Sequence, residues 1–238
     1  MVQGDTTSGL APVGRETMQD RVYSELRRAL ICGLFAPGQI LTIRQLSDAL
    51  LTSTMPVREA LGRLITENAL ETLPNRQVRV PLVTQERLDD LLRARILIEG
   101  EAVALATPHI DAVRMAQLSK IMAEWERLRQ RGNPETIDRE ATLNHAFHFL
   151  IYEAGGSTVM IPLIASLWLQ SGPCTRASIH AFSEAGESDA ARYHHALLEA
   201  LTKRDPEAAR AALVADISRP FALLKAKLDT EKQPEVQT

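Results

Sequence analysis

Residues 33–61 read GLFAPGQILTIRQLSDALLTSTMPVREAL, and this stretch holds two short amphipathic segments separated by a tight break. Pro37-Gly38 marks a turn, after which a short helix is expected over about residues 44–50. Ser53 can then cap a second helix that runs to about residue 68. Two short helices joined this closely are typical of a helix-turn-helix.

The segments on either side of this stretch complete the pattern of a winged helix. An amphipathic helix is expected over residues 18–32 and ends at Gly33. Two short segments that contain both apolar and polar residues, 70–73 and 78–80, flank Pro74-Asn75-Arg76-Gln77, which indicates a β-hairpin with a basic tip. In a winged helix the second of the two short helices enters the major groove of DNA.

Several side chains of these elements are candidates to contact DNA. The buried stripe of the second short helix leaves Thr54, Met55 and Arg58 facing outward. Arg58 can bond guanine or phosphate, or it can pair with a neighbouring acid on a solvated face. Arg76, at the tip of the hairpin, can reach phosphate or the minor groove.

The charge distribution agrees with this division of the chain. The 238 residues carry a formal net charge of -3. Residues 18–82 hold eight arginines, six acids and no lysine, a net charge of +2, whereas residues 83–238 carry -4. Any contact with a polyanion is therefore expected in the first part.

The composition predicts a globular, mainly α-helical protein. Hydrophobic residues make up 45% and charged residues 24%, which excludes collagen-like and fully disordered chains. Aromatic residues make up only 4%, fewer than strand-rich folds prefer. The two cysteines, Cys32 and Cys174, lack a CxxC spacing, so a reducing, cytoplasmic location is expected.

Two segments could be mistaken for a leader or a membrane span. Residues 1–17 are too polar for a signal peptide and are expected to form a flexible arm. Residues 154–175 carry no charge, but glycines and prolines interrupt the apolar run and leave it too short to cross a bilayer. A buried helix is expected there, with no membrane as a partner.

From Thr84 the sequence becomes a series of helices with short breaks. The helices are expected over about residues 84–107, 110–131, 135–154, 157–170, 174–184, 189–203 and 206–228. The fold class expected is mainly α, with a winged helix-turn-helix over 18–82, an antiparallel bundle of six to seven helices over 83–228, and a flexible tail over 229–238. Bundles place metal and cofactor sites between facing helices.

Four polar side chains lie on apolar faces of the predicted bundle. Asn144 and His148 are four residues apart, a spacing that lets two side chains share one ion. His194 and Asp216 lie on two later helices among leucines and isoleucine. A histidine in such a place is more often a hydrogen-bonded core residue than a ligand, so a metal site and a structural cluster both remain open.

Three blocks of the first part resemble the winged-helix domain of GntR-type bacterial transcription regulators. The blocks are residues 33–41, 46–47 and 56–61, in the order and at the spacing of the family pattern. The resemblance implies that Arg44, Arg58 and the wing backbone contact double-stranded operator DNA. Two residues depart from the family pattern: Thr54 stands where arginine is common, and Gln77 where the wing turn commonly has glycine. A paralogue with weakened specific DNA binding is therefore an alternative.

Residues 84–228 resemble the FCD effector domain of the fatty-acid-metabolism-regulator (FadR) branch of these regulators. The residues that carry the resemblance are 95–99, 144–148 and 194–201. It implies a homodimer with a small carboxylate effector and a divalent metal such as zinc, nickel or manganese. The implied metal ligands are Asn144, His148, His194 and Asp216, the last of which stands where histidine is usual.

Two arginines are candidates to pair with the effector carboxylate. Arg95 and Arg176 each lie in or beside an apolar helix. For Arg95, a structural pair with Glu99 at i, i+4 is an equal alternative.

The predicted function is a ligand-responsive transcription regulator that binds a palindromic operator as a dimer. A metal-dependent enzyme is the alternative, with His148, His194 and Asp216 around an activated water. That alternative leaves residues 18–82 without a role, and no further residue is placed as a general base.

Overall fold

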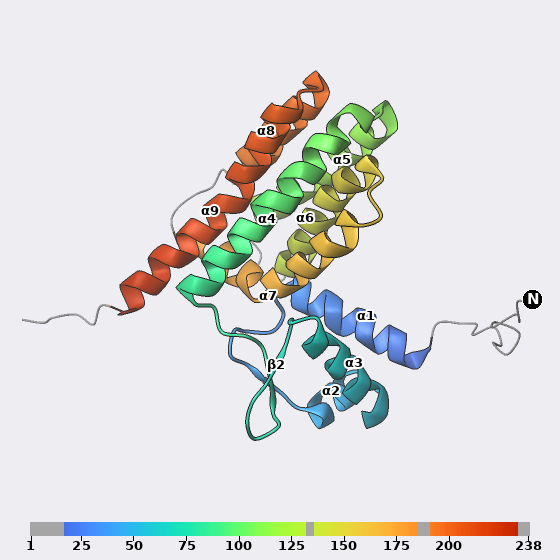
Figure 1. Cartoon of the computed structure of the whole chain (residues 1–238), viewed down its shortest axis with the longest axis vertical. Helices are drawn as coiled ribbons and strands as arrows, with labels where there is room; N and C mark the ends of the chain where they lie inside the picture. The colour runs from blue at the N-terminus through green and yellow to red at the C-terminus, as the bar shows by residue number, and fades with distance from the viewer. Residues whose placement is uncertain (1–16, 132–135, 185–190, 233–238) are drawn as a thin grey trace, which may run out of the picture.

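The computed structural model of the chain describes residues 17–131, 136–184 and 191–232. It is mainly helical and consists of an N-terminal winged helix and a C-terminal helical bundle, as the sequence predicted (Figure 1). The predicted N-terminal arm lies outside the described residues, except for Thr17.

The winged helix contains α1 (Met18–Ile31), α2 (Ile43–Ala49) and α3 (Thr54–Thr66). Thr17 begins α1 with a capping box, because its hydroxyl accepts from the Asp20 N–H while the Asp20 carboxylate accepts from the Thr17 N–H. α1 and α3 pack together and bury their apolar stripes in one core.

Ser53 precedes α3 as predicted, but its side chain makes no capping hydrogen bond. The third residue of α3 is Pro56, which has no N–H to donate to the serine hydroxyl. The proline is tolerated in this first turn because the N–H groups there have no partner within the helix.

The wing is a small antiparallel sheet. The predicted hairpin is present as β2 (Glu71–Thr72) and β3 (Val78–Arg79). A third strand, β1 (Ile40–Leu41), pairs with β3, so the strand order is β1-β3-β2. The sequence analysis missed β1 because two residues are too few to show an alternating pattern.

The bundle contains six α-helices within the described residues, in agreement with the predicted fold class. α4 lies against α9 along the bundle, α8 packs against α9, and α5 packs against α6 (Figure 1). The bounds are α4 (Gln85–Ala106), α5 (Ala112–Arg131), α6 (Ile137–Tyr152), α7 (Met160–Glu184), α8 (Ala191–Lys203) and α9 (Pro206–Lys232). The 3₁₀ turns η1 (Thr107–His109) and η3 (Glu153–Gly155) follow α4 and α6.

Two predicted helix ends are wrong. The break expected at Gly172-Pro173 is absent, since α7 runs through both residues. Pro173 cannot donate to the carbonyl of Leu169, but the helix continues past it, and the residues on both sides of the proline, Gly172 and Cys174, are buried in the core. The final helix continues to Lys232, so residues 229–232 of the predicted tail are helical. No helix in the described ranges is long and apolar enough to cross a membrane.

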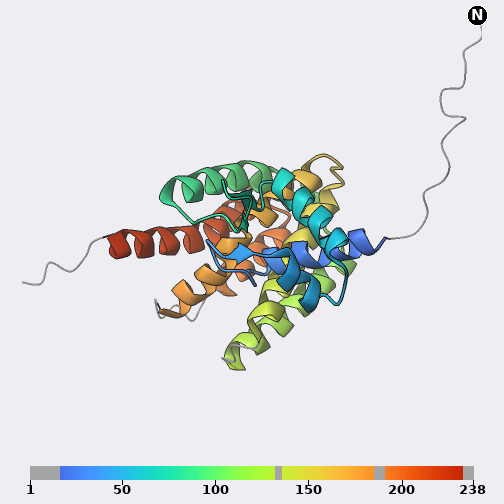
Figure 2. The same cartoon turned by 90° about the horizontal axis from the view of Figure 1, so that it is seen from below.

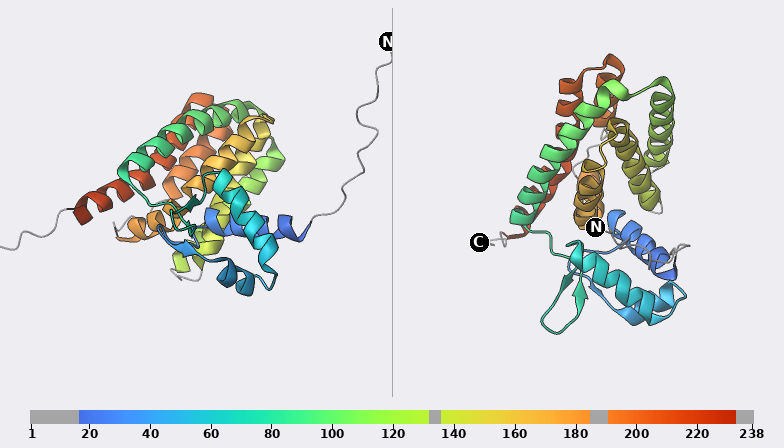
Figure 3. Two further views of the ribbon diagram at one scale, coloured as in Figure 1. Left: turned by 60° about the horizontal axis from the view of Figure 1, so that its bottom comes forward. Right: turned by 45° about the vertical axis from the view of Figure 1, so that its right-hand side comes forward.

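The winged helix sits against one end of the bundle, and α1 makes the contact (Figures 2 and 3). Arg27 Nη2 donates to the carbonyl oxygen of Ala165 on α7 at 3.2 Å. Gly172 approaches α1 so closely that a Cβ atom there would lie 2.0 Å from the carbonyl oxygen of Leu30. The backbones of α1 and α7 are therefore in direct contact, which only glycine allows at this position.

Candidate functional site

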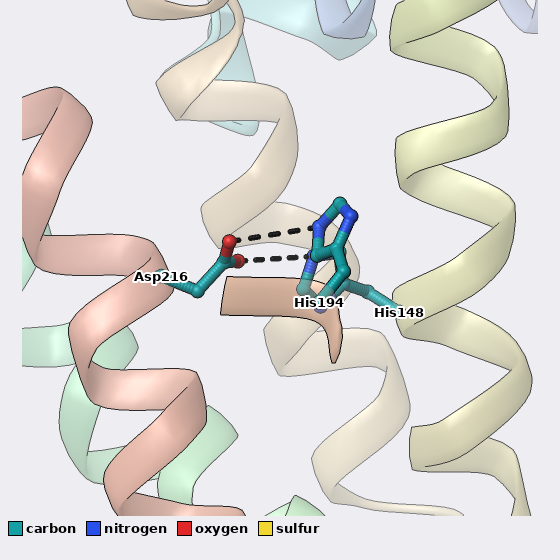
Figure 4. Close-up of side chains that lie close together, drawn as sticks. All are labelled: His148, His194 and Asp216. Atoms are coloured by element: carbon teal, nitrogen blue, oxygen red, sulfur yellow. Dashed lines mark ion pairs between the residues drawn. The ribbon is translucent and has the colours of Figure 1, made fainter. Parts of the chain in front are cut away.

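Three of the four predicted metal ligands meet inside the bundle (Figure 4). His148 lies on α6, His194 on α8 and Asp216 on α9. His148 Nε2 is 3.2 Å from Asp216 Oδ2, and His194 Nε2 is 3.5 Å from Asp216 Oδ1. One ligand atom of each residue lies within 4.8 Å of the other two.

The donor set and its spacing fit a divalent cation. Ligand atoms that bind one ion at about 2.0–2.2 Å lie roughly 3–3.5 Å apart in a tetrahedral arrangement, close to the two measured nitrogen–oxygen distances. Two imidazoles and one carboxylate suit zinc and nickel, and the carboxylate also suits manganese. The residues present therefore fit the metal that the sequence analysis predicted.

The electrostatics of the site also favour a cation. Burial, opposed by the charge of Asp216, lowers the pKa of His194 to about 4, so this imidazole is neutral near pH 7 and keeps a lone pair. Burial alone would raise the pKa of Asp216, but His194 and His148 bring it below its ordinary value. The aspartate therefore offers a negative charge beside the two rings.

A cavity of about 90 Å³ adjoins the three residues. Asn144, the fourth predicted ligand, lines this cavity one helical turn before His148. Trp168 and Phe221 form part of its apolar wall. The volume corresponds to about three water molecules, so it suits a ligand of only a few non-hydrogen atoms.

Arg95 forms the structural pair that was one of its two predicted roles. Its Nε is 2.6 Å from Glu99 Oε1 and its Nη2 is 3.2 Å from Glu99 Oε2. Burial would lower the pKa of Arg95, but the charge of Glu99 raises it above its ordinary value. The guanidinium also lies 4.7 Å from the centre of the Trp168 ring and lines the cavity. A role toward an effector stays a prediction for Arg95. The same holds for Arg176, which lies on α7 outside the residues whose side chains are described.

Sequence reasoning missed two residues of this site. The Tyr152 hydroxyl donates to Glu99 Oε2 at 2.7 Å, and its oxygen lies 3.4 Å from His148 Nδ1. Trp168 Nε1 donates to the same Glu99 oxygen at 3.0 Å. Burial, and then the charge of Glu99, raise the pKa of Tyr152 well above its ordinary value. Tyr152 follows His148 by four residues, the spacing that linked Asn144 to His148, and this signal could have found it.

The predicted DNA-contact residues are all exposed. Thr54, Met55 and Arg58 project from α3 into solvent, while Arg44 is exposed on α2. Within the described part of the chain, Arg58 forms no ion pair, so the alternative of a paired surface arginine is not observed. These elements and the hairpin extend away from the bundle (Figure 3).

The tip of the hairpin explains the departure at Gln77. Arg76, not Gln77, adopts the left-handed conformation, with φ +63°. The Gln77 N–H donates to Asn75 Oδ1 at 3.1 Å, and Asn75 Nδ2 donates back to Gln77 Oε1 at 2.8 Å. The turn is thus closed by side-chain hydrogen bonds around an exposed arginine, without a glycine.

A winged helix joined to a helical bundle is the architecture of a DNA-binding regulator with a second, helical domain. Residues 18–80 match the family model for bacterial regulatory proteins of the gntR family, and residues 90–219 match the FCD domain. The chain belongs to the GntR family and carries an FCD domain, which confirms the resemblance seen in the sequence. It is a transcriptional regulator of this type; its place in the FadR branch stays a prediction.

Relatives that align with nearly the whole chain support this family assignment. The HTH-type transcriptional regulator McbR of Escherichia coli (strain K12) is 30% identical over 204 residues, which cover 86% of this chain and 91% of that protein. A solved structure of E. coli McbR/YncC has a TM-score of 0.82 at 28% identity and covers 90% of this chain and 100% of its own. A putative GntR regulator from Rhodococcus sp. RHA1 shares the fold, with a TM-score of 0.69 at 24% identity over 87% of this chain and 98% of its own. The matching families and relatives are regulators and not enzymes, as the sequence analysis predicted.

Proposed function

We propose that this protein is a cytoplasmic, ligand-responsive regulator that binds a palindromic operator as a homodimer. The observation that carries the proposal is one chain that combines an exposed recognition helix with a buried His148–His194–Asp216 cluster beside a cavity. Neither feature alone requires the other, and a sensor that controls DNA binding accounts for both.

The DNA-binding half of the proposal assigns roles to exposed residues. Arg58 and its neighbours Thr54 and Met55 would read base edges or phosphates in the major groove. Arg44 on α2 and Arg76 on the wing would contact the backbone or the minor groove. A two-fold dimer would set two copies of α3 about one turn of DNA apart, roughly 34 Å.

The sensor half of the proposal rests on the cavity. Asn144, His148, His194 and Asp216 would hold the divalent ion, and the bound ion would supply positive charge for a carboxylate. Arg95, which lines the same cavity, would supply a second positive charge to the effector carboxylate. Arg176 is a further candidate for this role. Because the cavity holds about 90 Å³, the effector would be an acid of few carbons. Its binding would change operator affinity by favouring one of two domain arrangements.

The test is selection of bound fragments from the source genome by the purified protein, followed by footprinting at several salt concentrations. One palindromic site with a steep salt dependence is the expected result. Weak retention of every sequence alike, with and without small carboxylates, would instead support a paralogue that has lost specific DNA binding through the change at Thr54.

A further inference from the structure

The buried hydrogen bonds beside His148 carry an inference about how the metal ligand is held, and it rests on the metal site proposed above. Glu99 is fully buried and accepts hydrogen bonds from three helices. Arg95 donates to it from α4, Tyr152 from α6 and Trp168 from α7. All three donors surround one carboxylate that does not itself touch the metal cluster.

The proton positions in this network follow from what each group can donate. Glu99 is ion-paired with Arg95 at 2.6 Å, so its oxygens act as acceptors. Tyr152 has a single hydroxyl proton, and the 2.7 Å bond places it toward Glu99. The tyrosine oxygen can then only accept from His148 Nδ1, 3.4 Å away. Where the tyrosine oxygen and Nδ1 share a hydrogen bond, His148 carries a proton on Nδ1 and donates it to Tyr152.

A neutral imidazole with its proton on Nδ1 has its lone pair on Nε2. In this protein Nε2 faces Asp216 Oδ2 at 3.2 Å, so a lone pair and a carboxylate point at each other. That contact is repulsive unless a cation lies between the two atoms. A proton on Nε2, in the other neutral tautomer or in an imidazolium, would also relieve it through a metal-free hydrogen bond to Asp216, and the experiment below separates these cases.

We propose that Glu99 and Tyr152 are positioning residues that fix the orientation and proton of His148 so that Nε2 is presented to a divalent cation together with Asp216. Neither residue contacts the cation. Their effect passes through the His148 ring: Tyr152 lies beside its Nδ1, and Glu99 accepts the tyrosine proton, so the negative charge behind the tyrosine makes the ligating nitrogen more basic. The network also links α4, α6 and α7 beside His148, where it restricts the movement of the proposed metal ligands.

The experiment compares metal binding by the full-length protein and two tyrosine variants. Tyr152→Phe removes only the hydroxyl from the network. Tyr193→Phe is the matched control, because Tyr193 is half-buried on α8 directly before His194, and within the described residues its hydroxyl accepts a hydrogen bond from the neighbouring Arg192 and not from the network. Affinities for zinc(II), nickel(II) and manganese(II) are measured by competition with a chelator. The expected loss for Tyr152→Phe is about 10-fold to 100-fold, with Tyr193→Phe unchanged.

A spectroscopic signature separates positioning from a general packing effect. In zinc-loaded protein labelled with ¹⁵N-histidine, His148 should show a hydrogen-bonded Nδ1 proton that exchanges slowly with water. Tyr152→Phe should lose that protection when it is measured at a temperature at which the metal-free variant is still folded. The wild-type spectrum tests the proton assignment even if the variant folds poorly.

Each outcome bears on a different statement. Metal binding by wild type and Tyr152→Phe with equal affinity, or a His148 Nδ1 without a proton, would overturn the positioning role alone. Wild-type protein that binds none of the three metals, with His148 doubly protonated, would overturn the metal site itself and the inference that rests on it.

Discussion

The winged helix and the bundle carry their functional residues in opposite ways. In the winged helix, the DNA-contact candidates Thr54, Met55 and Arg58 fall within five consecutive residues and all face solvent. In the bundle, His148, His194 and Asp216 come from three helices and meet only because those helices pack together. A surface that reads a partner can be built from local sequence, whereas a buried site depends on the whole core.

This difference predicts different consequences of mutation. A change on the exposed face of α3 should alter binding with little effect on stability, because those side chains make few contacts within the protein. A change among the buried residues should alter ligand binding and folding together. Four substitutions test this difference between the exposed surface and the buried core.

Arg58→Ala should abolish specific operator binding and leave the fold intact. Loss of a base or phosphate contact in both copies of a dimer should weaken binding by about 2–6 kcal/mol, roughly 30-fold to 20,000-fold. Footprinting on the selected site measures this. Arg93→Ala, at an exposed arginine of α4, serves as the control. Unchanged operator affinity in the Arg58 variant would refute the role of α3.

Gly172→Ala should disrupt the contact between the two domains. The new Cβ would overlap the Leu30 carbonyl oxygen, and overpacking of this kind destabilises by about 3 kcal/mol. Gly62→Ala is the matched control, since nothing lies within 4 Å of a Cβ there and alanine should stabilise α3 by about 0.5–1 kcal/mol. Urea unfolding of both variants measures the difference. Equal stabilities would show that α1 and α7 can separate freely.

His148→Ala should remove the bound metal. Protein purified without chelator should contain about one ion per chain, and the variant about none. Added metal should raise the unfolding free energy of the wild type by about 2.7 kcal/mol at 100 times its Kd, and should not stabilise the variant. Elemental analysis and thermal unfolding measure both effects. Full metal content in the variant would place the ion elsewhere.

Arg76→Ala should have the smallest effect. A wing-tip contact with phosphate should weaken binding to all DNA sequences alike and lower the slope of log affinity against log salt by about one per contact. Filter binding at four salt concentrations on operator and random DNA measures the slope. A loss confined to the operator would instead indicate that the wing reads sequence.

Sequence patterns predicted the winged helix almost completely. Its turns, caps and apolar stripes involve residues close together in the chain, so the helices and the outward face of α3 follow from local rules. The exceptions are also local: β1 is too short to show a pattern, and Pro56 removes the N–H that Ser53 would have bound.

The bundle was predictable only in part. Helix periodicity located most of the elements and singled out the four candidate ligands on apolar faces, and a family resemblance implied their role. The continuation of α7 through Pro173 could not be predicted from the local sequence, because it depends on packing against distant helices. The roles of Glu99, Tyr152 and Trp168 depend on three helices that converge on one carboxylate, which no single segment of sequence records.

The close approach of Gly172 to Leu30 has a mechanical consequence. When one of two packed helices moves slightly, the side chains between them usually change rotamer. Most helix contacts therefore tolerate small displacements. At this point no side chain stands between the two backbones. α7 also contributes Trp168, one turn before Gly172, and Cys174 to the wall of the cavity. If α7 moved by a fraction of an ångström at the cavity, the backbone of α1 would therefore have to move by a similar amount.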